Sequence, residues 1–178
     1  MDQDKSNIVL IGMPGSGKST VGVLVAKEAA RGFVDTDLLI QSAQGRTLQD
    51  IVDSDGHMAL RKIEEAVLLT LTLTDHVIAT GGSAAYSHEA MTHLKGSGTV
   101  VFLDVNLKTL RSRIHNYDTR GLAKRPDQTL DELFDERLAL YTRYADITVK
   151  ASDIGQDMVC SAIIDALAIQ RRVPNRTG

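Results

Sequence analysis

A glycine-rich segment near the start of the chain has the residue types needed to bind a row of phosphates. Residues 12–19, Gly-Met-Pro-Gly-Ser-Gly-Lys-Ser, fit the pattern G-x-x-x-x-G-K-[S/T] at every position. Glycines allow the main chain to curl so that successive N–H groups point at phosphate oxygens, and the N-terminus of a following helix adds partial positive charge. Lys18 would reach the β- and γ-phosphates, and the Ser19 hydroxyl would ligate Mg²⁺. The expected contacts to a nucleoside triphosphate are Gly12, Gly15, Ser16, Gly17, Lys18, Ser19 and Thr20.

Two acidic residues, Asp35 and Asp37, could serve the molecule that accepts the phosphoryl group. They follow an apolar run that predicts a strand, so their carboxylates should lie at the carboxyl edge of the sheet, where open α/β folds bind ligands. In an extended stretch, residues two apart share a face, so both carboxylates could point into one pocket. The alternative is that they only cap the helix that starts near Leu38.

Short apolar runs alternate with helical periodicity along the chain, and this order predicts the fold class. Strands are expected at 8–11, 33–35, 77–80, 100–103 and 147–149. Helices are expected at 18–30, around 39–40, at 58–71 and 88–94, after Asn106, from Thr129, and at 157–169. Such alternation implies right-handed crossovers. It therefore predicts a three-layer α/β fold, a five-stranded parallel sheet with helices on both faces, in a single domain over residues 1–178.

One segment, residues 116–128, lacks apolar periodicity and contains three basic side chains. These are Arg120, Lys124 and Arg125. We expect this segment, called the lid below, to be a mobile loop rather than a packed element.

The composition excludes several classes of protein. The chain has 178 residues, a formal net charge of −3 and a pI near 5.9, so no positive field would draw it to nucleic acid or an anionic membrane. Cys160 is the only cysteine, which excludes an internal disulfide and a thiolate metal cluster. The N-terminal residues do not resemble a signal peptide. The composition indicates a cytoplasmic protein, which we expect to act as a monomer. Its expected partners, ATP and a small anionic metabolite bearing a hydroxyl, follow from the motifs rather than from the composition.

These motifs, in this order and over nearly the whole chain, resemble the shikimate kinase family. The resemblance is carried by the glycine-rich segment, Asp35-x-Asp37, residues 60–64, Gly81-Gly82, and Arg137 with Tyr141. It implies a nucleoside-monophosphate-kinase-like fold with a lid. It also implies an ATP-dependent, Mg²⁺-requiring transfer of the γ-phosphate to a ring hydroxyl of shikimate, in the pathway to aromatic amino acids.

The resemblance implies roles for residues on the acceptor side. Asp37 would hold and deprotonate the accepting hydroxyl, and Asp35 would lie near Mg²⁺ with Ser19. Arg61 and Arg137 would grip the substrate carboxylate, because a guanidinium fork meets a carboxylate in bidentate fashion. The substrate site would then comprise Asp37, Arg61, Gly81, Gly82 and Arg137. The alternative for Arg61 is a solvated helix face, paired with Glu64 or Glu65.

Two arginines complete the expected site. Arg113 resembles the arginine that stacks on adenine, and Arg120 resembles the lid arginine that adds positive charge when the lid closes. The expected catalytic residues are Lys18, Asp37 and Arg120. The alternative for Arg120 is an exposed side chain in a flexible loop.

At two positions the chain departs from the family pattern. A third glycine is replaced by Ser83, whose side chain could crowd the substrate or add a hydrogen bond. The lid has Gly121 where proline is expected, which makes ordering of the loop more costly in entropy. Other acceptors, such as homoserine or gluconate, therefore stay open. A nucleoside-monophosphate kinase and a nucleotide-driven switch or ATPase are more distant alternatives.

Overall fold

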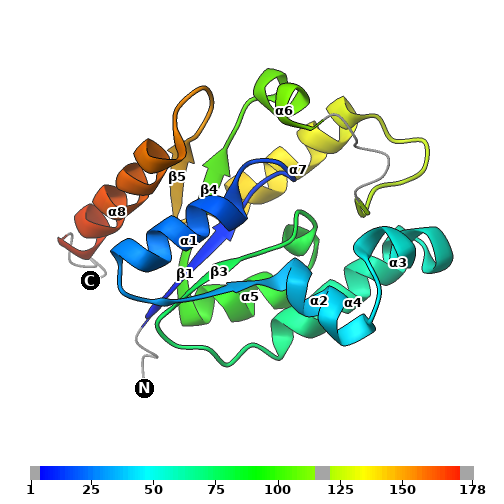
Figure 1. Cartoon of the computed structure of the whole chain (residues 1–178), viewed down its shortest axis with the longest axis horizontal. Helices are drawn as coiled ribbons and strands as arrows, with labels where there is room; N and C mark the ends of the chain where they lie inside the picture. The colour runs from blue at the N-terminus through cyan, green and yellow to red at the C-terminus, as the bar shows by residue number, and fades with distance from the viewer. Residues whose placement is uncertain (1–4, 115–120, 173–178) are drawn as a thin grey trace.

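A five-stranded parallel sheet forms the centre of the molecule, in the order β2-β3-β1-β4-β5 (Figure 1). The computed structural model describes residues 5–114 and 121–172. The strands are β1 (Asn7–Ile11), β2 (Gly32–Asp35), β3 (His76–Ala79), β4 (Gly98–Asp104) and β5 (Ile147–Lys150). In the register of the sheet, Val9 lies between Ile78 of β3 and Val100 of β4. The predicted fold class is therefore confirmed.

Helices cover both faces of this sheet. On one face, α1 (Lys18–Glu28) packs against α8 (Gln156–Arg172), and on the other α5 (His88–Ser97) and α7 (Leu130–Tyr144) contact β4 (Figure 1). Three more helices form a group beside the sheet, in which α4 packs against α2 and α3: α2 (Thr36–Gln44), α3 (Leu48–Asp55) and α4 (His57–Leu69). The remaining elements are the 3₁₀ turn η1 (Ala84–Tyr86) and α6 (Leu107–Arg113).

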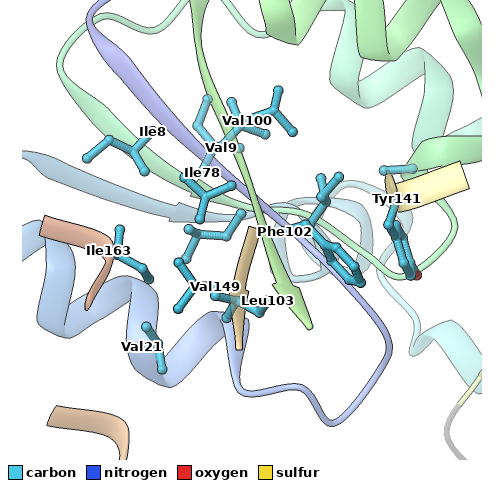
Figure 2. Packing of buried hydrophobic residues seen from close by; sticks show 14 of the residues in the cluster. Ile8, Val9, Val21, Ile78, Val100, Phe102, Leu103, Tyr141, Val149 and Ile163 are labelled. Carbon is cyan, nitrogen blue, oxygen red and sulfur yellow. The ribbon is translucent and has the colours of Figure 1, made fainter. Parts of the chain in front are cut away.

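The main core lies on both sides of β1, which explains why this strand is a continuous apolar run. Its residues Ile8 to Ile11 are at most 2% exposed, since helices exclude water from both faces. Figure 2 shows Val9, Ile78 and Val100 from three neighbouring strands side by side, and the Phe102 ring near that of Tyr141, with centroids 5.2 Å apart. Burial of each such side chain contributes roughly 1.5–3 kcal/mol. This core holds the loops at the carboxyl ends of the strands.

A second, much smaller apolar cluster joins α2, α3 and α4 to the lid. Its buried members are Ile40, Ile51, Leu60 and Ala123. Ala123 belongs to the lid and is 3% exposed. The expectation that the lid does not pack is therefore wrong for Gly121, Ala123 and Gln128, which are buried, whereas residues 125–127 of this loop are exposed. Residues 116–120, with Arg120, lie outside the described residues.

The sequence predicted the start of two helices and missed a third helix altogether. Asn106 caps α6 through Thr109 N–H, and Thr129 forms a capping box with Glu132 at the start of α7, as expected. No helix was predicted at α3, which has a single fully buried apolar residue, Ile51. The available signal was another capping box, formed by Thr47 and Asp50.

None of the helices in the described parts of the chain is long and apolar enough to cross a bilayer.

Candidate active site

A cavity of about 420 Å³ opens at the carboxyl edge of the sheet, where the sequence placed the ligand. It is lined by the loop after β1 and the start of α1, by the turn after β3, by the lid, and by residues of α2, α3, α4, α6 and α7. Of the predicted site residues it contains Gly15, Gly17, Lys18, Ser19, Thr20, Asp37, Gly81, Gly82, Arg113 and Arg137. Gly12, Ser16, Asp35 and Arg61 do not line it. Most of the predicted residues thus meet in one space.

The loop between β1 and α1 forms one side of the cavity, which we call the phosphate half (residues 12–20). Gly15 and Gly17 have φ of 80° and 96°, so the loop curls tightly before α1 begins at Lys18. The Lys18 ammonium group donates to the carbonyl oxygens of Gly12 and Met13 at 2.8 and 2.9 Å. Burial lowers the pKa of Lys18 to about 8. The ammonium group also donates to the Ser16 hydroxyl at 3.4 Å. A buried ammonium held by these neutral oxygens is suited to receive a phosphate in their place.

Ser19 and Asp35 form a pair of oxygen ligands next to this loop. The Ser19 hydroxyl donates to Asp35 Oδ2, and Asp35 Oδ1 accepts from the main-chain N–H of Asp37 at 2.9 Å. Mg²⁺ prefers oxygen ligands and usually keeps only one or two from the protein, with phosphate and water completing its shell. The described residues contain no group of three or more His, Cys, Asp or Glu side chains that could hold a metal. The pair therefore fits a magnesium ion that arrives with a nucleotide.

The expectation that Asp35 and Asp37 share one face of an extended stretch is wrong. Asp35 ends β2 and is the N-cap of α2, whereas Asp37 lies in the first turn of that helix. Asp35 therefore does cap the helix, as the alternative expected, but Asp37 does not. Asp37 reaches the cavity because the helix turns it there.

A second carboxylate, Glu64, lies beside Asp37 on the acceptor side. A Cβ at Gly81 would come within 2.4 Å of Glu64 Oε1 and 2.6 Å of Asp37 Oδ1, so only glycine allows both acids to approach the main chain there. Glu64 is 2% exposed, and Oε2 accepts a hydrogen bond from the Ser83 hydroxyl. Burial, and in second place the charge of Asp37, raise the pKa of Glu64 to about 7.

Sequence analysis missed Glu64 as a site residue and considered it only as a surface partner of Arg61. The signal was its position on α4, in the middle of a buried stripe with Leu60 and Leu68. A carboxylate in such a stripe points toward the interior rather than to solvent. The two acids that line the cavity are therefore Asp37 and Glu64, rather than the expected pair Asp35 and Asp37.

The two arginines expected on the acceptor side converge on a single oxygen atom. Nη2 of Arg61 and Nη2 of Arg137 donate to the carbonyl oxygen of Ala123 at 3.0 and 3.1 Å. Arg137 is 1% exposed, and the Arg61 guanidinium carbon lies 3.5 Å from the centre of the Tyr86 ring. A carboxylate oxygen could take the place of the Ala123 carbonyl between them.

Two other predicted residues support the cavity. The Tyr141 hydroxyl donates to the Gly82 carbonyl at 2.6 Å, which ties the turn after β3 to α7. Arg113, at the end of α6, lines the cavity, and its Nη2 donates to the Ala151 carbonyl at 3.4 Å. Both contacts hold the rim of the cavity in place. We call the side formed by Asp37, Glu64, the turn 81–83, the two arginines and the described part of the lid the acceptor half.

Comparison with known proteins relates the chain to shikimate kinases. Residues 14–168 match the family model described as shikimate kinase. A shikimate kinase of Vibrio parahaemolyticus is 35% identical over 167 residues, covering 92% of this chain and 97% of that protein. The crystal structure of the Aquifex aeolicus shikimate kinase is 34% identical, with a TM-score of 0.81, and covers 93% of this chain and 98% of the other. The Acinetobacter baumannii shikimate kinase, solved in complex with shikimate, is 28% identical, with a TM-score of 0.87 and coverage of 96% and 97%.

Proposed function

The chain belongs to the shikimate kinase family, and we infer from this premise that it transfers the γ-phosphate of ATP to a hydroxyl of shikimate. The observation that carries the inference is one cavity in which the phosphate half faces the acceptor half. Lys18 lies on the first side, and Asp37 and Arg137 on the second. A donor and an alcohol bound there would be next to each other, which is the main requirement of phosphoryl transfer.

We propose that each half binds one substrate through the residues expected from the sequence. Lys18 and the main chain of residues 12–20 hold the β- and γ-phosphates, and Arg113 lies against the adenine. Arg61 and Arg137 take the shikimate carboxylate in place of the Ala123 carbonyl. Ser19 and Asp35 would hold Mg²⁺, which supplies positive charge to the phosphate oxygens.

In the proposed reaction, Asp37 accepts the proton of the attacking hydroxyl. A bond forms between that oxygen and the γ-phosphorus, the bond to the β-phosphate oxygen breaks, and ADP leaves. Positive charge from Lys18 stabilises the transferring group. Arg120 would add to this charge from the lid.

The acceptor half favours an alcohol over the phosphate of a nucleoside monophosphate, one of the alternatives that the sequence left open. Asp37 and Glu64 would repel the phosphate of a nucleoside monophosphate but can accept hydrogen bonds from hydroxyls. The paired arginines suit an acceptor that carries a carboxylate. We propose that the enzyme acts as a monomer in the cytoplasm, in the pathway to aromatic amino acids, which agrees with a single, buried cysteine.

A coupled assay of ADP release tests this function. The wild type is expected to turn over shikimate faster than homoserine, gluconate, AMP, CMP or UMP. Asp37→Asn should lower kcat by about 10²–10⁴-fold, because the general base is lost, and should leave the KM for ATP nearly unchanged. Asp165→Asn, an exposed acid on α8, is the matched control. Faster turnover of another acceptor, or an Asp37→Asn variant with wild-type kcat, would refute the corresponding part of the proposal.

A further inference from the structure

Ser83 is one of the two departures from the family pattern, and its side chain does not stabilise the turn in which it lies. It precedes η1, but its hydroxyl makes no capping hydrogen bond to that turn. The hydroxyl instead donates to Oε2 of Glu64, which lies 19 residues earlier on α4. Ser83 is 7% exposed and lines the cavity. The hydroxyl thus connects two elements of the acceptor half.

This hydrogen bond leaves the other oxygen of Glu64 without a partner. Among the described residues, Glu64 Oε1 is buried and accepts no hydrogen bond. It lies against Gly81, at the place where Asp37 Oδ1 also lies. A buried carboxylate oxygen without a donor is costly, and such groups are normally satisfied by a ligand or a water molecule. A donor supplied by the bound substrate would remove that cost.

The charges that face Glu64 come from four helices. Lys18 of α1 and Arg137 of α7 favour the ionised carboxylate, whereas Asp37 of α2 opposes it. Arg61 is the nearby cation on α4 itself and contacts Ala123 and Tyr86. Among these charges, the hydrogen bond from the Ser83 hydroxyl to Oε2 orients the carboxyl group.

We propose that Ser83 is a positioning residue, whose hydroxyl fixes Glu64 so that Oε1 is presented to a second hydroxyl of the acceptor, beside the one held by Asp37. The proposal rests on the proposed function and narrows the acceptor to molecules with neighbouring hydroxyls. Shikimate satisfies this condition, because its ring carries adjacent hydroxyls. Homoserine, with one hydroxyl, does not.

Steady-state kinetics separate this role from simple packing. Ser83→Ala keeps the Cβ but removes the donor, and is expected to raise the KM for shikimate about 10-fold, with little change in kcat or in the KM for ATP. Ser83→Thr keeps a hydroxyl and should lie closer to the wild type than Ser83→Ala. In a Glu64→Gln background, Ser83→Ala should add little, because the two residues act as one unit. An equal effect in both backgrounds would overturn the proposal.

A second measurement tests the hydrogen bond between Ser83 and Glu64 in the absence of substrate. The carboxyl carbon of Glu64 is titrated by ¹³C NMR and assigned by its absence in Glu64→Gln. Since a hydrogen bond to the ionised form lowers a carboxyl pKa, the midpoint should move to higher pH in Ser83→Ala and in Ser83→Gly. An unchanged midpoint would refute the pairing, and a shifted midpoint with an unchanged KM for shikimate would refute the positioning role. A wild type that does not phosphorylate shikimate would contradict the proposed function, and the titration would still decide the pairing.

Discussion

The two halves of the cavity are built in different ways. The phosphate half is one continuous stretch, residues 12–20, between β1 and α1, and both of these elements belong to the main core. The acceptor half collects side chains from α2, α4, the turn after β3, α7 and the lid. Its apolar support is the small cluster formed by Ile40, Ile51, Leu60 and Ala123. The first half depends on local main-chain geometry, and the second on tertiary packing.

This difference explains where the chain departs from the family pattern. Ser83 and Gly121 both lie in the acceptor half, and the phosphate half fits its motif at every position. Side chains brought together from separate elements can be exchanged one at a time, whereas a main-chain curl depends on all of its glycines at once. The acceptor half is therefore the part in which substrate preference can change without loss of nucleotide binding.

The largest expected effect is that of Lys18→Ala. The variant should lose roughly 10³-fold in kcat/KM for ATP, because the charge at the β- and γ-phosphates is lost. If the halves are independent, shikimate binding measured by calorimetry should stay near the wild-type value. Lys27→Ala, an exposed lysine of the same helix, is the control. A folded Lys18→Ala variant that no longer binds shikimate would show that the halves are coupled.

A smaller effect is expected in the pH dependence of stability, from the buried acid of the acceptor half. The folded-state pKa of Glu64, about 7, lies above its ordinary value of 4.5, so the folded protein binds this proton more tightly than the unfolded chain. The resulting stabilisation is complete below pH 4.5 and is lost as the pH rises through 7. Between pH 5 and pH 8 the wild type should lose up to about 3 kcal/mol relative to Glu64→Gln.

Urea unfolding at several pH values measures this difference. Glu89→Gln, an exposed acid on α5, is the control for removal of one carboxylate. A difference in unfolding free energy between the wild type and Glu64→Gln that stays constant at all pH values would mean that ionisation of Glu64 does not destabilise the folded protein.

The smallest expected effect comes from the lid, through a pair of glycines with the same backbone angle. Gly121 and Gly45 both have φ of 63°, but a Cβ at Gly121 would lie 2.4 Å from Gln49 N, whereas at Gly45 it would meet nothing within 4 Å. Gly45→Ala should cost about 1 kcal/mol in stability and leave the KM for shikimate unchanged. Gly121→Ala should also displace the lid and raise the KM for shikimate about tenfold, because the Ala123 carbonyl moves relative to Arg137.

Steady-state kinetics and urea unfolding of Gly45→Ala and Gly121→Ala test this difference. Equal KM values for shikimate in the two variants would show that packing of the lid does not affect substrate binding in the acceptor half. The family proline is not expected to improve the lid here. Gly121→Pro cannot reach a φ of 63° and would lose the N–H that donates to Gln49.

Much of the fold and of the site was predictable from local patterns. The five strands were visible as apolar runs bounded by glycine or acidic residues. The starts of α6 and α7 were visible from their N-capping residues. Asp37 was found from its place after the second strand, and Arg113 and Arg137 through the family resemblance. All three line the cavity. The helix α3 was missed because one buried residue in eight gives little periodicity.

The sequence by itself determined the phosphate half, because the loop geometry depends on residues that are consecutive in the chain. Only the tertiary structure decided the pairing of Ser83 with Glu64, the meeting of Arg61 and Arg137 at Ala123, and the packing of the lid on α3. These contacts join residues 14 to 72 positions apart. Burial of apolar surface over the whole domain offsets the entropy cost of bringing such distant residues together. A local sequence pattern does not contain this information.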